Sequence, residues 1–249
     1  MLLQDTALVY GRYLRQSLRS RFALLFGLLM PLLYLVFFGP LLTGLPLGGG
    51  GSSWQLLVPG LLLQLALFGA AFAGFGIIVE KGQGVVERMR VTPVSRLALL
   101  LGRVLRDATV TVLQAVLLVL AAVVMGLRAP LAGILIGFAF VALLTVSLGS
   151  LSYAVAMKVN TPQEFGPLVN AVTMPSMLLS GLMLPMSLAP AWLDVLSHVM
   201  PLRYLVDAVR DAYVGSYTTG HLLRGVLVAC GLAVSAVTAG TRVFRTAGA

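Results

Sequence analysis

Charged side chains are scarce in this 249-residue chain. Asp, Glu, Lys and Arg make up only 10% of it, whereas an ordinary soluble domain has about 25%. Hydrophobic residues make up 59%, and the mean hydropathy is +1.00. This composition excludes a soluble fold and indicates an all-α integral membrane protein, because the apolar runs approach the roughly 20 residues that a spanning helix needs. They lack the ten-residue alternation of barrel strands.

Several chemical signatures are also missing. There is no G-x-x-x-x-G-K-[ST] phosphate loop, so this chain lacks the usual cradle for ATP. H-E-x-x-H is absent, and His198 and His221 have no metal-ligand company, so we predict no metal site, no cofactor in this chain and no enzyme activity. The single Cys230 can form no intrachain disulfide. Carboxylates are sparse in the apolar runs, which disfavours a proton-driven carrier.

The apolar runs predict one transmembrane domain over residues 1–249. A basic, amphipathic segment, 1–21, precedes the first run and suits an interfacial helix that contacts anionic membrane lipid. In the fourth run, Gly133 and Gly137 have the G-x-x-x-G spacing that permits close helix approach. Six spans are predicted, at 22–42, 54–79, 104–126, 131–157, 166–185 and 222–241.

The cations predict the orientation in the membrane. Thirteen of the 17 Lys and Arg residues fall on one side of the predicted layout and four on the other. By the positive-inside rule both termini and the segment 80–103 are cytoplasmic, in the cell (inner) membrane. This asymmetry explains the net charge of +9 better than a nucleic-acid partner does.

The segment 186–215 lies on the opposite, external side. It reads as short amphipathic helices interrupted by prolines, which at membrane depth require cover from protein or a watery cavity. Its polar face carries Arg203, Asp207 and Arg210, and Asp207 can pair with either arginine. We favour a structural role for these residues over substrate recognition.

A sharp change in polarity follows the second span. No side chain from Phe22 to Val79 is charged, and then EKGQGVVERMRVTPVSR begins at Glu80. Such a segment belongs at the membrane surface. The segment predicts a short helix that has apolar side chains on one face and ends before Pro93. Two readings are open at this point: a helix that docks on another protein, or a solvated connection.

Two stretches carry a family resemblance. GVVERMRVTPVSRLALLLGRVL, residues 84–105, resembles the G-T-L-E-R-L-x-x-T-P-V-S-R element of permeases in the ABC-2 transporter family. LPMSLAPAWLDVLSHVMPLRYLVDAVR, residues 184–210, is similar to their external segment, which commonly ends N-P-L-x-Y-x-V-D-A-L-R. Val85 and Met200 depart from those patterns, at positions where Thr and Asn are frequent. The order of the two motifs and the six-span layout extend the resemblance over essentially the whole chain.

The resemblance implies that the first motif is a coupling helix on an ATP-binding cassette subunit. It implies two copies of that ATPase, which bind ATP and Mg, and a homodimer of permeases or a related second permease. Glu80 and Lys81 lie at the junction with span two, where they would pass the movement of the coupling helix on to that span. The expected ATPase-contacting residues within the motif are Gly84, Glu87, Arg88, Met89, Arg90, Thr92 and Pro93.

The expected function is ATP-driven efflux. The apolar spans favour a hydrophobic or amphipathic substrate, and the short loops resemble drug and antibiotic resistance exporters of the daunorubicin-resistance type. Export of a lipid or lipid-linked glycan is the nearest alternative, and a secondary transporter or a scaffold is an alternative of another class. Within the spans, Gln64, Gln114 and Asn170 either line a transport path or bond between helices. Arg103 can pair with Asp107 four residues on.

Overall fold

The computed structural model describes residues 2–43, 52–83, 95–183, 186 and 189–246, and within these ranges the chain forms helices and no strand. The all-helical prediction is confirmed. The bounds are α1 Leu2–Arg19, α2 Arg21–Thr43, α3 Ser53–Ala71, α4 Phe75–Gly82, α6 Arg96–Val124, α7 Leu131–Lys158, α8 Pro162–Leu179, α9 Ala191–Ser197, α10 Pro201–Val214 and α11 Gly220–Thr246.

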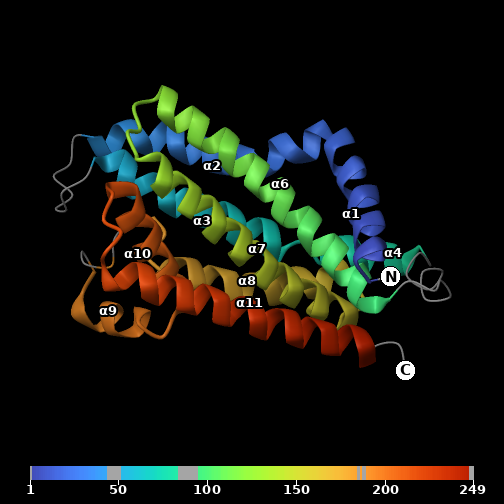
Figure 1. Cartoon of the computed structure of the whole chain (residues 1–249). Helices are drawn as coiled ribbons and strands as arrows, with labels where there is room; N and C mark the ends of the chain where they lie inside the picture. The colour runs from blue at the N-terminus through green and yellow to red at the C-terminus, as the bar shows by residue number, and fades with distance from the viewer. Residues whose placement is uncertain (1, 44–51, 84–94, 184–185, 187–188, 247–249) are drawn as a thin grey trace.

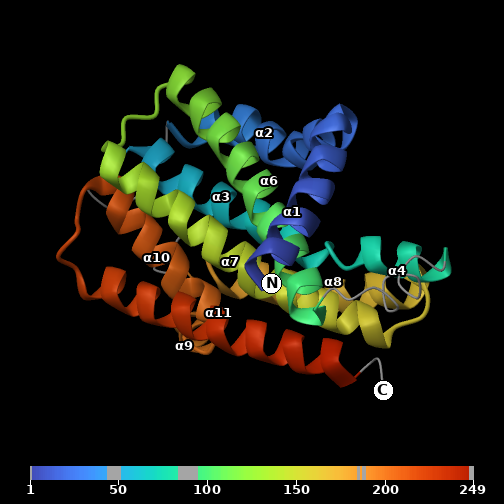
Figure 2. The same cartoon turned by 45° about the vertical axis from the view of Figure 1, so that its right-hand side comes forward.

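The long helices lie side by side in one bundle (Figures 1 and 2). The start of α1, the whole of α4 and the last turns of α11 gather at one end, which we call the α4 end. The two short helices α9 and α10 lie at the opposite end (Figure 1). The chain therefore returns to the end of the bundle from which it starts.

Five helical segments of the described chain are long and apolar enough to cross a membrane: Leu24–Leu42, Ser53–Gly82, Leu97–Val124, Leu131–Lys158 and Gly220–Val243. This makes the protein a multi-pass membrane protein. The helix α8, at the fifth predicted span, is not among them, and its first turn, Pro162, Gln163 and Glu164, is polar. It contacts both α4 and α9, which lie at opposite ends of the bundle. A sixth crossing by α8 stays a prediction.

The segment between the second and third spans is more helical than predicted. Glu80 and Lys81 still belong to α4, and α6 begins at Arg96, eight residues before the predicted start of the third span at 104. The Ser95 hydroxyl accepts a hydrogen bond from the Ala98 N–H at 3.2 Å and so caps α6. The sequence predicts a loop over 96–103 because an unpaired charge is costly near hydrocarbon. In the fold, Arg103 is paired, and the helix can continue through it.

The first helix, α1, packs on α6 along one side and exposes an apolar flank. Leu3 and Leu18, on the apolar side of the predicted interfacial helix, are 86% and 45% exposed, as a side that faces the membrane requires, and the interfacial position stays a prediction. The side that packs on α6 carries Tyr13, Val9 and Tyr10, and Val9 lies against Gly102 of α6. A second, apolar flank of α1 is therefore left on the surface of the subunit.

The centre of the bundle is α3, which is apolar on all sides and buried over most of its length. It contacts α2, α6, α7 and α10. A helix without a polar face has no side to present to water, so it takes the central position. Around it, α2 and α11 expose large apolar side chains, as expected of helices that face lipid or another subunit.

Close approach of α7 to α10 depends on the predicted pair of glycines. A Cβ at Gly133 would overlap the Ala212 carbonyl oxygen, and one at Gly137 would lie 3.0 Å from the Tyr213 ring. Both neighbours belong to α10. The prediction that this spacing permits close helix approach is confirmed.

We expect Gly133→Ala to destabilise the protein. The added methyl group would have to displace a backbone carbonyl, and overpacking of this kind typically costs about 1–3 kcal/mol. The measurement is the Tm of the detergent-purified chain. Gly149→Ala in the same helix is the matched control, because a Cβ there meets nothing within 4 Å and alanine is the better helix former. Equal Tm values for the two variants would contradict the close contact between α7 and α10.

Candidate functional site

The charged end of α4 directly precedes, in the sequence, residues 84–94 of the first motif. Arg103 Nη2 of α6 donates a hydrogen bond to Glu80 Oε2 at 2.5 Å, and the two side chains form an ion pair. The Arg103 side chain is only 6% exposed and that of Glu80 is 21% exposed. A guanidinium group so far from water requires a counter-charge, so this pair fixes α4 on α6.

Helix α1 joins the same pair through Tyr13. The Tyr13 hydroxyl donates to Glu80 Oε2 at 3.3 Å, and the Arg103 guanidinium lies over its ring, 4.7 Å from the centroid. Burial raises the pKa of the Tyr13 hydroxyl, so it stays protonated and a donor at neutral pH. One aromatic side chain of the first helix thus contacts both members of the α4–α6 ion pair.

A second pair lies one turn further along α6. Arg106 Nη1 bonds to Asp107 Oδ1 at 2.6 Å, and the Tyr153 hydroxyl of α7 donates to the other carboxylate oxygen. The predicted i, i+4 contact of Arg103 with Asp107 is replaced by this arrangement, because Glu80 takes the Arg103 guanidinium. Two acids balance two bases in these pairs, so the buried group is neutral. We call the whole set the charge cluster: Tyr13, Glu80, Arg103, Arg106, Asp107 and Tyr153.

Lys81 points to a different helix. Its Nζ donates to the carbonyl oxygens of Met157 and Val159 at 3.3 and 3.0 Å, at the C-terminal end of α7. These carbonyls have no partner further along their own helix, and the helix dipole favours a cation there. Helix α4 is therefore held on one side by α6 and α1 and on the other by α7.

The other predicted ATPase-contacting residues lie outside the described residues. The chain is described up to Gln83 and again from Ser95, so only the helices on either side of the motif can be placed. The predictions that fall within 84–94 are Gly84, Glu87, Arg88, Met89, Arg90, Thr92 and Pro93.

The three predicted path amides have different surroundings. Gln114 Nε2 donates to the Leu24 carbonyl oxygen of α2 at 2.9 Å, which is the interhelical use of an amide. Gln64 is buried in α3, and its carbonyl oxygen has no hydrogen-bond partner among the described residues. Asn170 lies on the exposed surface of α8.

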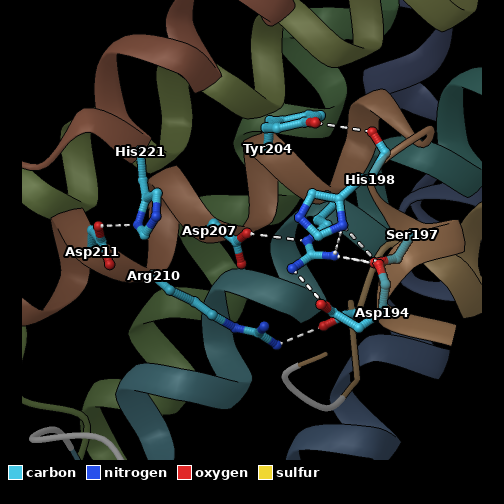
Figure 3. Close-up of polar contacts among 10 residues, drawn as sticks. Asp194, Ser197, His198, Tyr204, Asp207, Arg210, Asp211 and His221 are labelled. Carbon is cyan, nitrogen blue, oxygen red and sulfur yellow. Dashed lines mark hydrogen bonds and ion pairs between the residues drawn. The ribbon is translucent and has the colours of Figure 1, made fainter. Parts of the chain in front are cut away.

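The predicted polar face of α10 forms a cluster with α9 (Figure 3). Arg203 forms an ion pair with Asp207 at 3.7 Å, which is one of the two pairings predicted for Asp207. It also pairs with Asp194 of α9 at 2.7 Å. It also donates to the Ser197 hydroxyl and lies 3.0 Å from His198 Nδ1. These contacts attach α9 to α10.

Arg210 has a separate role on the same helix (Figure 3). Its guanidinium donates to the carbonyl oxygens of Leu56 at 3.3 Å and Gly181 at 2.7 Å, which belong to α3 and the turn after α8. Burial lowers the pKa of Arg210 to about 10, partly opposed by Asp207. Burial also raises the pKa of Asp207, against the influence of Arg210 and Arg203. Arg210 therefore remains a cation at neutral pH and ties three segments together.

Sequence reasoning missed Tyr13, Arg106 and Tyr153. Each lies on a helix that the sequence identifies by its apolar residues, so its polar side chains receive no assigned partner. No spacing along the chain links a residue of α1 to one of α4. The available signal is the excess of cations from Glu80 to Asp107, where six Lys and Arg residues accompany three carboxylates. Among the described residues, no group of His, Cys, Asp and Glu could hold a metal ion.

The chain matches known transport proteins over most of its length. The family model of the ABC-2 type transporter matches residues 4–214. "Putative transport permease ycf38" of Cyanophora paradoxa is 25% identical over 216 residues, covering 85% of this chain and 74% of the relative. "Probable doxorubicin resistance ABC transporter permease protein DrrC" of Mycobacterium tuberculosis is 24% identical over 229 residues, covering 90% and 82%.

"Probable multidrug ABC transporter permease YbhR" of Escherichia coli is 26% identical over 159 residues, covering 63% of this chain and 43% of the relative. The all-helical bundle with several apolar helices fits a membrane transporter family. The chain therefore belongs to the ABC-2 type transporter family, as a permease subunit.

Proposed function

We propose that this permease forms half of an exporter that moves a hydrophobic or amphipathic compound out of the cell, driven by a separate ATP-binding cassette subunit. The observation that carries the proposal is the double attachment of α4, whose Glu80 and Lys81 are bonded to different helices. A segment pushed by an ATPase can do work on the spans only if its ends are fixed to them. Orientation with α4 and both termini in the cytoplasm is part of the same proposal.

The charge cluster would transmit that force from α4 to other helices. Arg103 connects α4 to α6, and Tyr13 connects the same pair to α1. The Lys81 contacts reach the end of α7. A displacement of α4 therefore loads three helices together, because buried ion pairs resist separation far more than exposed ones.

Helix α8 is our candidate for the wall of the transport path. Only Phe165, Val169 and Thr173 are buried along it, and its remaining surface includes the exposed amide of Asn170. Pro175 has no N–H to donate to the Ala171 carbonyl, so polar backbone lies beside that amide. Hydrocarbon cannot satisfy such groups, so this surface requires water or a second permease subunit. That requirement favours a dimer of permeases with α8 at the shared path.

The names of two relatives bear on the substrate. One is called a multidrug permease and another a doxorubicin resistance permease. The exposed amide of α8 within otherwise apolar surroundings suits an amphipathic molecule of this kind, since a small ion would find too few polar groups to replace its water.

We expect the Glu80→Arg and Arg103→Glu variants each to impair ATP-driven transport by about tenfold or more, equivalent to ~1.4 kcal/mol. Each change places two like charges together in a buried site. The double variant, with the charges exchanged, should recover most of the activity. The measurement is ATP-dependent doxorubicin uptake by inverted vesicles that contain the permease and its ATP-binding subunit.

Two controls accompany the exchange. Membrane level and elution volume of each variant separate loss of function from loss of folding. Arg128→Glu, an exposed charge reversal in the connection between α6 and α7, should leave ATP hydrolysis and transport close to wild type. If the exchanged pair is no better than the single variants, the ion pair does not transmit force. If no ATP-binding subunit associates with the wild-type permease, the exporter proposal itself fails.

We expect Asn170→Cys, in a Cys230→Ser background, to react with a water-soluble maleimide in the assembled complex. A thiol reacts as the thiolate, which forms in water but not in hydrocarbon. Val234→Cys on α11 is the control, since this apolar side chain is 66% exposed on a spanning helix. Labelling is read by mass spectrometry. Equal, negligible labelling of both positions would place the Asn170 surface against lipid or dry protein.

A further inference from the structure

The second span is interrupted close to its α4 end. Helix α3 ends at Ala71 and α4 begins at Phe75. In a continuous helix the Gly74 N–H would bond to Ala70, and the Phe75 N–H to Ala71. Here the Phe75 N–H bonds to the Phe72 carbonyl at 3.1 Å. The interruption therefore leaves the Ala71 carbonyl and the Gly74 N–H without partners in their own segment.

One hydroxyl group of α7 satisfies both. Ser152 Oγ accepts a hydrogen bond from the Gly74 N–H at 2.9 Å and donates one to the Ala71 carbonyl oxygen at 2.6 Å. A hydroxyl can do both at once, which a backbone group cannot. Ser152 is 6% exposed, so water does not compete for either bond. The break is therefore stabilised by a side chain from another helix.

The backbone at the break lies directly on its neighbours. A Cβ at Gly74 would come within 2.6 Å of the Phe165 ring, 2.7 Å of the Ser152 carbonyl oxygen and 2.9 Å of the Ala156 Cβ. Only glycine fits at this distance. The contact brings α7 and α8 together at the point where α3 changes into α4.

A row of contacting aromatic rings links the break to α8. Phe72 and Phe75 stack with centroids 5.7 Å apart, and Phe75 meets Phe165 of α8 edge to face at 4.9 Å. Phe165 is fully buried. A tilt of α4 about the break would therefore move the ring that contacts the first turns of α8.

We infer that Ser152 is a positioning residue for energy transfer: its hydroxyl keeps the second span divided at Ala71–Gly74, so that α4 pivots as a separate lever and moves α8 through Phe75 and Phe165. This inference rests on the proposed function, because the lever needs an ATPase to push it. Without the hydroxyl, the two freed backbone groups would be satisfied by closing the break into a continuous helix. Helix α4 would then be rigidly joined to the immobile centre of the bundle.

The test measures hydrogen exchange in the permease–ATPase complex with and without ATP. In the wild type we expect ATP to change deuterium uptake in peptides covering 72–78 and 162–179. Ser152→Ala should lose the ATP-dependent change in 162–179 while still binding the ATPase. Ser152→Thr, which keeps the hydroxyl, should retain it. Ser150→Ala is the matched control, since this buried serine of α7 bonds only to Val146 of its own helix.

The outcomes separate this inference from the proposed function. If no ATPase associates with the wild-type chain, both fall together. If it associates and the response of 162–179 is absent in the wild type, or survives in Ser152→Ala as in Ser150→Ala, the lever is overturned and the exporter stands. If Ser152→Ala does not fold, Ser152→Cys replaces it, because a thiol is a weak donor of similar size, and an unreduced response in that variant also overturns the lever.

Discussion

A bilayer offers no hydrogen bonds, so every polar group of this chain that leaves water must find its partner inside the protein. That constraint accounts for most of the specific contacts in the fold. The Arg103 guanidinium is buried because Glu80 and Tyr13 meet it there. The second span can be broken because Ser152 satisfies both sides of the break. Arg210 can enter the opposite end because backbone carbonyls of two segments receive it.

The same constraint divides the molecule into rigid and adjustable parts. Helix α3 is apolar on all sides, is buried over most of its length and forms the centre of the bundle. Helix α4 has eight residues, is separated from α3 by a turn, and is attached to its neighbours by the buried side chains of Ile77 and Ile78 as well as by charged and aromatic side chains. Because buried ion pairs resist separation, α4 is coupled to the helices that it contacts, whereas the turn before it interrupts the helical connection to α3. In the sequence α4 directly precedes residues 84–94, where the proposed function places the contact with the ATP-binding subunit.

Much of the architecture was accessible from the sequence because hydrophobicity and length alone decide which segments enter a membrane. The span predicted at 131–157 is α7 almost to the residue. The glycine spacing in it predicted a close helix contact that the fold contains. Failures came where a charge or a glycine depended on a distant partner. The sequence predicts a loop over residues 96–103 because no local pattern identifies Glu80 as the partner of Arg103. It predicts a continuous second span because Ser152, whose hydroxyl bonds to both sides of the break at 72–74, lies on a distant helix.

The sequence by itself determined that this is a helical membrane permease, since composition, apolar runs and two motifs are properties of a linear chain. Tertiary structure alone decided which polar residues meet. Tyr13 and Glu80 are 67 residues apart, and Gly74 and Ser152 are 78 residues apart. Hydrogen bonds and ion pairs act over a few ångströms, and no local pattern records which distant segments will be brought within that range.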